Sequence, residues 1–218
     1  MYFGYVMFDL DGTLTDPYYG ITNSIIHSMK YYPDKRVPSR EELRPFIGPP
    51  LADSYMKYFG LDEKQAREAV GHYREYYADK GIYENVLYPG VREMLAALSE
   101  RGIKIYMATS KPEKFAVRIA EHFGIVEYFD YICGSSMDGK FVEKKDIIAK
   151  IIEKENCGKK ETLMIGDTVF DIAGAVENKI TAAGVTYGFG SEEQLRRSGA
   201  SYIFGSPEEI RLALTGEN

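Results

Sequence analysis

The stretch Tyr5-Val6-Met7-Phe8-Asp9-Leu10-Asp11-Gly12-Thr13 joins an apolar run to two carboxylates and a glycine. The run over residues 5–8 has no polar alternation, which predicts a buried strand that ends at an Asp-Gly turn. Side chains two residues apart on an extended chain point to the same side, so Asp9 and Asp11 repel each other unless a cation or a proton intervenes. Such a pair suits a site where one carboxylate attacks and the other handles a proton.

Two different patterns follow this strand. Residues 17–88 contain successive helix-like stretches and no convincing strand, whereas strand-like and helix-like segments alternate from residue 89 onward. Alternation of this kind predicts a Rossmann-like α/β fold, with a mostly parallel sheet flanked by helices. We therefore expect an α/β core made of residues 1–16 and 89–218, interrupted by an all-α cap over residues 17–88. Inserts of this kind commonly act as lids.

Further carboxylates follow the strand expected over residues 162–165. Gly166-Asp167 comes directly after it, and Asp171 lies one helical turn further on, on the same face. Because ligands of open α/β sheets bind beyond the carboxyl ends of the strands, we expect these groups to meet Asp9 and Asp11. Converging carboxylates need a hard cation, and Mg²⁺ prefers a few carboxylate oxygens together with water and phosphate oxygens.

Groups that suit an anion follow the strand expected over residues 103–108. Thr109 offers a hydroxyl, and Ser110 offers a backbone amide at an expected loop–helix junction. An ammonium group comes from Lys144 or from its neighbour Lys145, and the sequence leaves open which of the two reaches the site. A phosphate bound among these groups would complete a site for phosphoryl transfer to a carboxylate.

In their order along the chain, four segments resemble the motifs of the haloacid-dehalogenase-like phosphohydrolases: Asp9-x-Asp11-Gly12-Thr13, Thr109, Lys144 and Gly166-Asp167-x-x-x-Asp171. The resemblance covers nearly the whole chain, and the helical insert resembles the small helical cap of that family. Three further segments are similar to its phosphoglycolate-phosphatase-like branch: Tyr88-Pro89-Gly90-Val91, Thr109-Ser110-Lys111-Pro112 and Gly188-Phe189-Gly190.

The resemblance implies roles for the four acids. Asp9 is the nucleophile and a metal ligand. Asp11 protonates the leaving alcohol and then activates water, while its carbonyl oxygen ligates Mg²⁺. Asp167 is the third protein ligand of the metal, and Asp171 orients a metal-bound water or Lys144.

The resemblance also implies a phosphate-binding set. Thr109, Ser110 and Lys144 hold the phosphoryl group, and Lys144 stabilises its charge. Ser110 stands where this branch often has Asn, which leaves the backbone amide in place but puts a side-chain contact in doubt. In the insert, Arg44 and Gly48 are candidates for substrate specificity, although a solvated arginine and a plain interhelical turn explain them almost as well.

The function implied is a Mg²⁺-dependent phosphatase that hydrolyses a small phosphomonoester through an aspartyl phosphate. The branch favours 2-phosphoglycolate as the substrate. A 5′-nucleotidase acting on nucleoside monophosphates, a sugar phosphomutase and a non-catalytic binding protein on the same scaffold stay open, because cap sequences do not reveal the substrate.

Composition limits the partners. A net charge of −6 and a pI near 5.3 argue against a nucleic acid polymer or an anionic membrane. No apolar stretch is long enough to span a bilayer and no signal peptide is visible, while Cys133 and Cys157 lack a C-x-x-C pattern. We expect a cytoplasmic protein, a monomer or a weak homodimer, whose partner is a small phosphorylated metabolite.

Tyrosines are concentrated in the insert, among them Tyr18, Tyr19, Tyr73, Tyr76 and Tyr77. They could stack on a nucleobase. We favour packing within the cap, because tyrosines at helical spacing usually contribute to a core.

Overall fold

The structure is a computed structural model that describes residues 2–137 and 141–216. The chain divides into two compact units. The first, which we call the core unit, combines Met1–Asp16 with Leu87–Asn218, and the second, the helical unit, is Pro17–Val86. The chain passes between them twice, where β2 (Thr15–Asp16) pairs with β3 (Val86–Leu87) in a two-stranded sheet. The core unit resumes at Leu87, slightly before residue 89, the position expected from the sequence.

The described part of the core unit contains a six-stranded sheet of order β5-β4-β1-β6-β7-β8. Every neighbouring pair in it is parallel, which confirms the expected α/β fold. Its strands are β1 (Tyr5–Phe8), β4 (Lys104–Pro112), β5 (Tyr131–Ser135), β6 (Thr162–Gly166), β7 (Thr181–Val185) and β8 (Tyr202–Phe204). The strand expected over residues 103–108 thus continues to Pro112, through a register shift against β5 that begins after Ala108.

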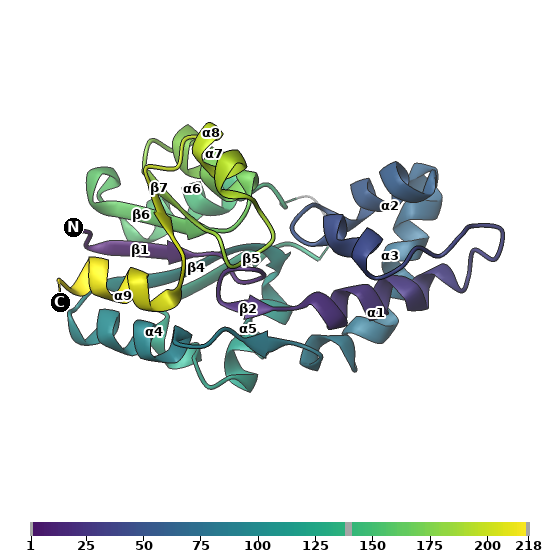
Figure 1. The fold of residues 1–218 in the computed structure, drawn as a ribbon, viewed down its shortest axis with the longest axis horizontal. Helices are drawn as coiled ribbons and strands as arrows, with labels where there is room; N and C mark the ends of the chain where they lie inside the picture. The colour runs from purple at the N-terminus through teal and green to yellow at the C-terminus, as the bar shows by residue number, and fades with distance from the viewer. Residues whose placement is uncertain (1, 138–140, 217–218) are drawn as a thin grey trace. The chain divides into compact units, whose positions relative to one another are not determined.

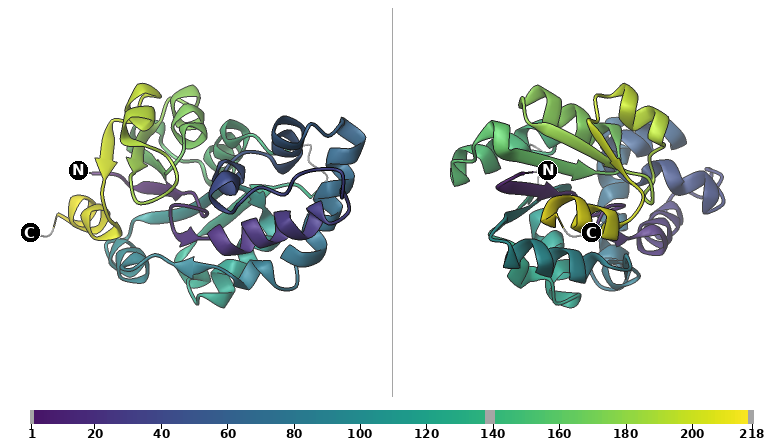
Figure 2. Two further views of the ribbon diagram at one scale, coloured as in Figure 1. Left: turned by 45° about the vertical axis from the view of Figure 1, so that its right-hand side comes forward. Right: turned by 60° about the vertical axis from the view of Figure 1, so that its left-hand side comes forward.

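Helices cover both faces of this sheet (Figures 1 and 2). One layer contains α6 (Lys144–Glu155), α7 (Val169–Glu177) and α8 (Glu192–Arg197). The other contains α4 (Val91–Glu100), α5 (Glu113–His122) and α9 (Pro207–Thr215). Short 3₁₀ turns at Val126–Tyr128 and Lys159–Glu161 lead into β5 and β6. A sheet covered on both faces explains why β1 reads as a continuous apolar run, with Val6, Met7 and Phe8 fully buried.

The strand order reverses at β1. The chain passes from β1 to its neighbour β4 and on to β5, and then returns through α6 to β6 on the other side of β1. Phe8 lies in register with Met107 of β4 and with Ile165 of β6. In open α/β sheets, the crevice outside the carboxyl ends at such a reversal is where ligands bind.

The helical unit consists of α1 (Tyr18–Met29), a 3₁₀ turn over Glu41–Phe46, α2 (Leu51–Phe59), α3 (Glu63–Tyr77) and a 3₁₀ turn over Gly81–Tyr83. A capping box starts α3, since the Asp62 carboxylate accepts from the Gln65 amide and the Gln65 side chain accepts from the Asp62 amide. Gly20 lets α1 lie against the turn at Gly81, because a Cβ on Gly20 would come within 2.0 Å of the Gly81 carbonyl oxygen.

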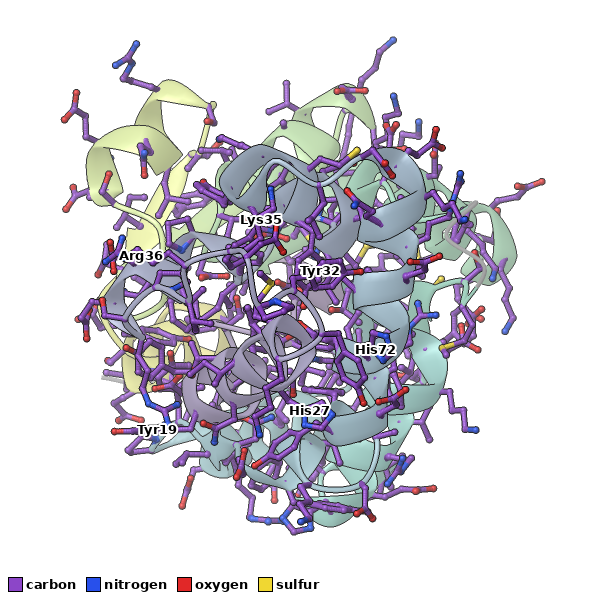
Figure 3. All side chains as sticks on the ribbon, turned by 90° about the vertical axis from the view of Figure 1, so that its right-hand side faces the viewer. Tyr19, His27, Tyr32, Lys35, Arg36 and His72 are labelled. Carbon is purple, nitrogen blue, oxygen red and sulfur yellow. The ribbon has the colours of Figure 1, made fainter. Side chains whose placement is uncertain are left out.

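The tyrosines of the helical unit divide into two groups. Tyr55, Tyr73 and Tyr77 are buried, and the rings of the last two stack at 5.3 Å. Tyr19 and Tyr32 are both labelled in Figure 3. Tyr19 is largely exposed, whereas the Tyr32 hydroxyl donates to the Gln65 carbonyl at 2.9 Å. The packing role expected of these residues therefore holds for the buried group.

Candidate active site

Asp9 and Asp11 follow β1 at the point where the strand order reverses. Asp9 is buried, and the chain turns directly after Asp11, with Gly12 at φ +86° and its amide donating to the Thr15 carbonyl at 2.7 Å. The turn requires glycine for a second reason, because a Cβ on Gly12 would lie 2.1 Å from Oδ2 of Asp167. The turn after β1 is thereby held against the carboxylate that follows β6.

Lys144 is the lysine that reaches this site. Its Nζ lies 2.8 Å from Oδ1 of Asp9 and 2.7 Å from Oδ1 of Asp171, and it donates to the Ala108 carbonyl at 2.8 Å. Its side chain is only 4% exposed. Lys145 has a 44% exposed side chain that pairs with Glu143 at 2.8 Å. The first residue of α6, and not the second, therefore brings its charge to the acids.

The two oxygens of the Asp171 carboxylate contact different residues, Thr168 and Lys144. Its Oδ2 accepts from the Thr168 amide at 3.0 Å and from the Thr168 hydroxyl at 2.8 Å, which forms part of the capping box of α7. Its Oδ1 faces Lys144. One carboxylate thus fixes the start of a helix and the direction of the lysine.

Asp167 is fully buried in a cradle of small residues. The Phe189 amide donates to its Oδ2 at 2.8 Å. A Cβ on Gly188 would lie 2.4 Å from the Asp167 Cβ, and one on Gly190 would lie 2.1 Å from the Asp167 carbonyl oxygen. The Gly188-Phe189-Gly190 segment, which sequence reasoning assigns no role in the site, therefore packs directly on this carboxylate. A backbone approach this close is the physical reason for both glycines.

Burial and mutual repulsion change the protonation of these groups. Burial raises the pKa of Asp9 to about 6, although Lys144 opposes the shift, and Asp171 adds to it. Burial, together with the charges of Asp171 and Asp9, also raises the pKa of Asp167 well above its usual range. Burial works against the charge on Lys144, but Asp171 and Asp9 outweigh it and raise the pKa of this lysine, which keeps it protonated at neutral pH.

The arrangement of the acids fits a divalent cation. Carboxylate oxygens of Asp9, Asp167 and Asp171 all lie within 4.8 Å of one another, and all three residues are buried. The ligands predicted from the family resemblance are Asp9, Asp167 and the carbonyl oxygen of Asp11. The side-chain positions add Asp171 as a further candidate ligand. Hard oxygen ligands of this kind are those that Mg²⁺ prefers.

The charge balance of the site supports the same conclusion. Four carboxylates face two ammonium groups, since Lys111 Nζ also lies 2.7 Å from Oδ2 of Asp11. With every group ionised, these four acids and two lysines together carry a surplus of two negative charges. A divalent cation would offset that surplus. Without a cation, protonation of Asp9 and Asp167 reduces it, in agreement with their raised pKa values.

The expected phosphate-binding residues lie at the end of β4. Thr109 is buried, and its Oγ1 accepts from the Lys111 amide at 3.2 Å. Ser110 lies within β4 and not at a loop–helix junction as expected, because the strand runs directly into α5. Sequence reasoning places Lys111 at this strand end but gives it no role in the site. The available signal is its spacing, because residues 109 and 111 share one face of an extended chain.

Arg44 and Gly48 belong to the helical unit. The Arg44 guanidinium lies 5.8 Å from the centre of the Tyr18 ring, a cation–π contact, and Gly48 has φ +106°. The part that these two residues take in substrate binding stays a prediction.

Comparison with known proteins decides the family. A model described as haloacid dehalogenase-like hydrolase matches residues 6–185. The chain belongs to this family. The resemblance read from the four motifs is thereby confirmed, and so is the expectation of a hydrolase.

Among relatives, a protein of Pseudomonas aeruginosa named 5′-nucleotidase is 44% identical over 191 residues, covering 88% of this chain and 86% of that protein. A Mycobacterium tuberculosis protein named tyrosine-protein kinase PtkA is 36% identical over 185 residues, which are 85% of this chain and 62% of that protein. A crystal structure of a predicted phosphatase from Clostridium acetobutylicum superposes with a TM-score of 0.93 at 43% identity, covering 98% of each chain.

No helix within residues 2–137 and 141–216 is both long and apolar enough to cross a bilayer. The cytoplasmic location and the oligomeric state stay predictions.

Proposed function

We propose that this protein is a Mg²⁺-dependent phosphatase that hydrolyses a small phosphomonoester through an aspartyl phosphate, an acyl phosphate formed on Asp9. The observation that carries the proposal is the position of Lys144, whose ammonium lies between the carboxylates of Asp9 and Asp171 in a buried site. A nucleophilic carboxylate beside a buried cation suits the transfer of a negatively charged phosphoryl group.

In the first half of the reaction, a carboxylate oxygen of Asp9 attacks phosphorus. The new bond joins Asp9 to phosphorus, and the bond between phosphorus and the ester oxygen breaks. Asp11 gives its proton to the departing alkoxide, which leaves as an alcohol. Lys144 and the Thr109 hydroxyl, with the Ser110 amide, hold the phosphoryl oxygens and stabilise their charge.

In the second half, Asp11 is a carboxylate and takes a proton from water. The resulting hydroxide attacks phosphorus, the bond to Asp9 breaks, and inorganic phosphate leaves. The same residue thus acts as acid and then as base, which restores the starting protonation.

The carboxylates of Asp9 and Asp167 would hold the proposed Mg²⁺, and the Asp171 carboxylate is close enough to contribute. By the family resemblance, the Asp11 carbonyl oxygen would be a further ligand. When bound, the metal supplies positive charge next to the transferred phosphoryl group and orients it. The raised pKa values of Asp9 and Asp167 support this metal site, because a bound cation would favour the ionised forms of both acids.

For the substrate, the motifs in the sequence favour 2-phosphoglycolate. We nevertheless rank nucleoside 5′-monophosphates ahead of it. The name of the Pseudomonas aeruginosa relative supports this order, since that protein is 44% identical over most of both chains. We propose that the helical unit, with Arg44 and Gly48, selects the substrate and closes as a lid. A phosphatase with this division of labour keeps its chemistry in the core unit and its specificity in the insert.

The kinase name of the Mycobacterium tuberculosis relative raises a second acceptor, a tyrosine hydroxyl in place of water. More than a third of that protein has no counterpart in this chain. We propose water as the acceptor, because the family model that matches residues 6–185 is described as a hydrolase. Incubation with ATP and a tyrosine peptide separates the two, since a kinase forms phosphotyrosine and a phosphatase does not.

The test is phosphate release from nucleoside 5′-monophosphates, 2-phosphoglycolate, sugar phosphates and p-nitrophenyl phosphate, with Mg²⁺ and with chelator. We expect Mg²⁺-dependent release, with the highest kcat/KM on a nucleotide. A higher kcat/KM on 2-phosphoglycolate would reverse the substrate order. Isomerisation of a sugar phosphate without release would identify a mutase, and tight binding without any turnover would favour a binding protein.

A further inference from the structure

Lys111 and Asp11 form an ion pair at the candidate site, separate from the two ion pairs of Lys144. The distance from Lys111 Nζ to Asp11 Oδ2 is 2.7 Å, and the two side chains are 6% and 13% exposed. An ion pair so shielded from water loses much of its Coulomb gain to desolvation, so it is weak evidence for a role in stability. Its geometric effect is stronger, because a charge-assisted contact at this distance fixes the direction of the carboxylate.

The backbone of Lys111 is held from both sides. Its amide donates to Oγ1 of Thr109 at 3.2 Å. On the neighbouring strand, Gly134 allows close approach, because a Cβ there would lie 2.6 Å from the Lys111 carbonyl oxygen. The register shift between β4 and β5 covers this same segment and ends where Pro112 pairs with Ser135. An irregular strand end that is this well fixed can aim a side chain.

The two oxygens of Asp11 differ in their surroundings. Oδ2 faces Lys111, while Oδ1 is buried and makes no hydrogen bond within the described residues. A buried carboxylate oxygen without a donor costs about 1–3 kcal/mol, so such an atom calls for a functional reason. A proton exchanged with a bound substrate is one.

We propose that Lys111 is a positioning residue for Asp11, which holds Oδ2 so that Oδ1 exchanges the proton with the leaving alcohol and then with water. This inference rests on the proposed function, in which Asp11 is the acid and base. The two lysines then have separate tasks. Lys144 serves Asp9 and the transferred phosphoryl group, whereas Lys111 serves the acid.

The loss of activity caused by removing Lys111 should therefore depend on the leaving group of the substrate. An alkoxide leaves only with a proton, so esters of ribose or glycolate need Asp11 in position. A p-nitrophenolate leaves without a proton. Since kcat/KM reports the steps up to formation of the phosphorylated Asp9, it isolates the acid role from the later activation of water.

The experiment compares Lys111→Met with wild type on a nucleoside monophosphate or 2-phosphoglycolate and on p-nitrophenyl phosphate. We expect kcat/KM to fall by about 10² on the alkyl ester and by less than about threefold on the aryl ester. Lys111→Arg should restore part of the activity on the alkyl ester. Lys114→Met, an exposed lysine of α5, is the matched control and should leave both values unchanged.

An equal fall on both esters would overturn the inference, because a purely structural role or direct phosphate binding affects them alike. If Lys111→Met does not fold, Lys111→Gln, which is one atom shorter than lysine but keeps a hydrogen-bond donor, gives the same comparison. The increase in Tm caused by Mg²⁺ should survive in every variant. A wild type that releases no phosphate from either ester would contradict the proposed function itself, which is a different result from an unchanged ratio.

Discussion

The Nζ of Lys144 lies 2.8 Å from Oδ1 of Asp9, and both side chains are buried. The lysine is the first residue of α6, and the acid follows β1, so the contact joins segments that are far apart in the sequence. It places a permanent positive charge beside the proposed nucleophile.

Replacing this lysine should remove that charge from the reaction. We expect Lys144→Met to lower kcat by about 10²–10³, the usual cost of losing one group that stabilises transferred charge. Lys145→Met is the control, since Lys145 pairs with Glu143 and is half-exposed, and its kcat should match wild type. Steady-state kinetics on folded protein, checked by circular dichroism, measure both. Equal losses in the two variants would remove Lys144 from its assigned role.

The glycine cradle around Asp167 should tolerate no side chain. We expect Gly188→Ala to destabilise the protein by about 1–3 kcal/mol and to abolish binding of Mg²⁺, because its Cβ would overlap Asp167. Gly71→Ala in α3 is the matched control. Its Cβ would meet nothing within 4 Å, so it should stabilise by up to about 1 kcal/mol. Urea unfolding with and without Mg²⁺ measures both effects, and a Gly188→Ala variant that binds metal normally would contradict the close approach.

Metal binding should release protons. Burial, with the neighbouring acids, raises the pKa values of Asp9 and Asp167, whereas a metal requires their ionised forms. The rise in Tm caused by Mg²⁺ should therefore be larger at pH 8 than at pH 6. Calorimetry in two buffers of different ionisation enthalpy measures the protons directly. A rise in Tm that is independent of pH, or titrations that do not depend on the buffer, would count against the assignment of these ligands.

The ionised Asp9 should destabilise the metal-free fold. Because burial raises its pKa to about 6 in the folded state, the folded protein binds this proton more tightly than the unfolded chain does. Its contribution to stability is present below the unfolded pKa of about 4 and is lost as the pH rises to about 6. We therefore expect Asp9→Asn to stabilise metal-free protein at pH 7.5, by on the order of 1–3 kcal/mol, with the gain shrinking toward pH 4.

Chemical unfolding at several pH values in the presence of chelator measures this gain. Asp79→Asn, an exposed acid of the helical unit, is the control and should show little change. Destabilisation by Asp9→Asn at neutral pH would mean that the pair with Lys144 outweighs burial.

The fold was predictable because its signals are local. The apolar run of β1, the Asp-Gly turn and the alternation after residue 89 each follow from neighbouring residues, and the sheet confirms them. Local signals also mislead. Ser110-x-x-Glu113 has the pattern of a capping box, yet α5 begins after Pro112 without a side-chain cap, because β4 continues through Ser110.

The site was predictable only where residues follow strands directly. Asp9 and Asp167 do so, and parallel pairing brings them together. The role of Gly188 and Gly190 depends on a contact with a carboxylate about 20 residues earlier, and no local pattern encodes such an approach. The pairing of Lys111 with Asp11 joins β4 to the turn after β1, and these two strands are neighbours only in the folded sheet.

The most direct test of the mechanism is detection of phosphate bound to Asp9 during turnover. Protein would be mixed with ³²P-labelled substrate and Mg²⁺, quenched in acid within milliseconds, and digested to locate the label. We expect label on the peptide that contains Asp9, formed and lost at least as fast as kcat, and none in a folded Asp9→Asn variant. Phosphate release at full rate with no label on that peptide, or continued turnover by Asp9→Asn, would contradict the mechanism.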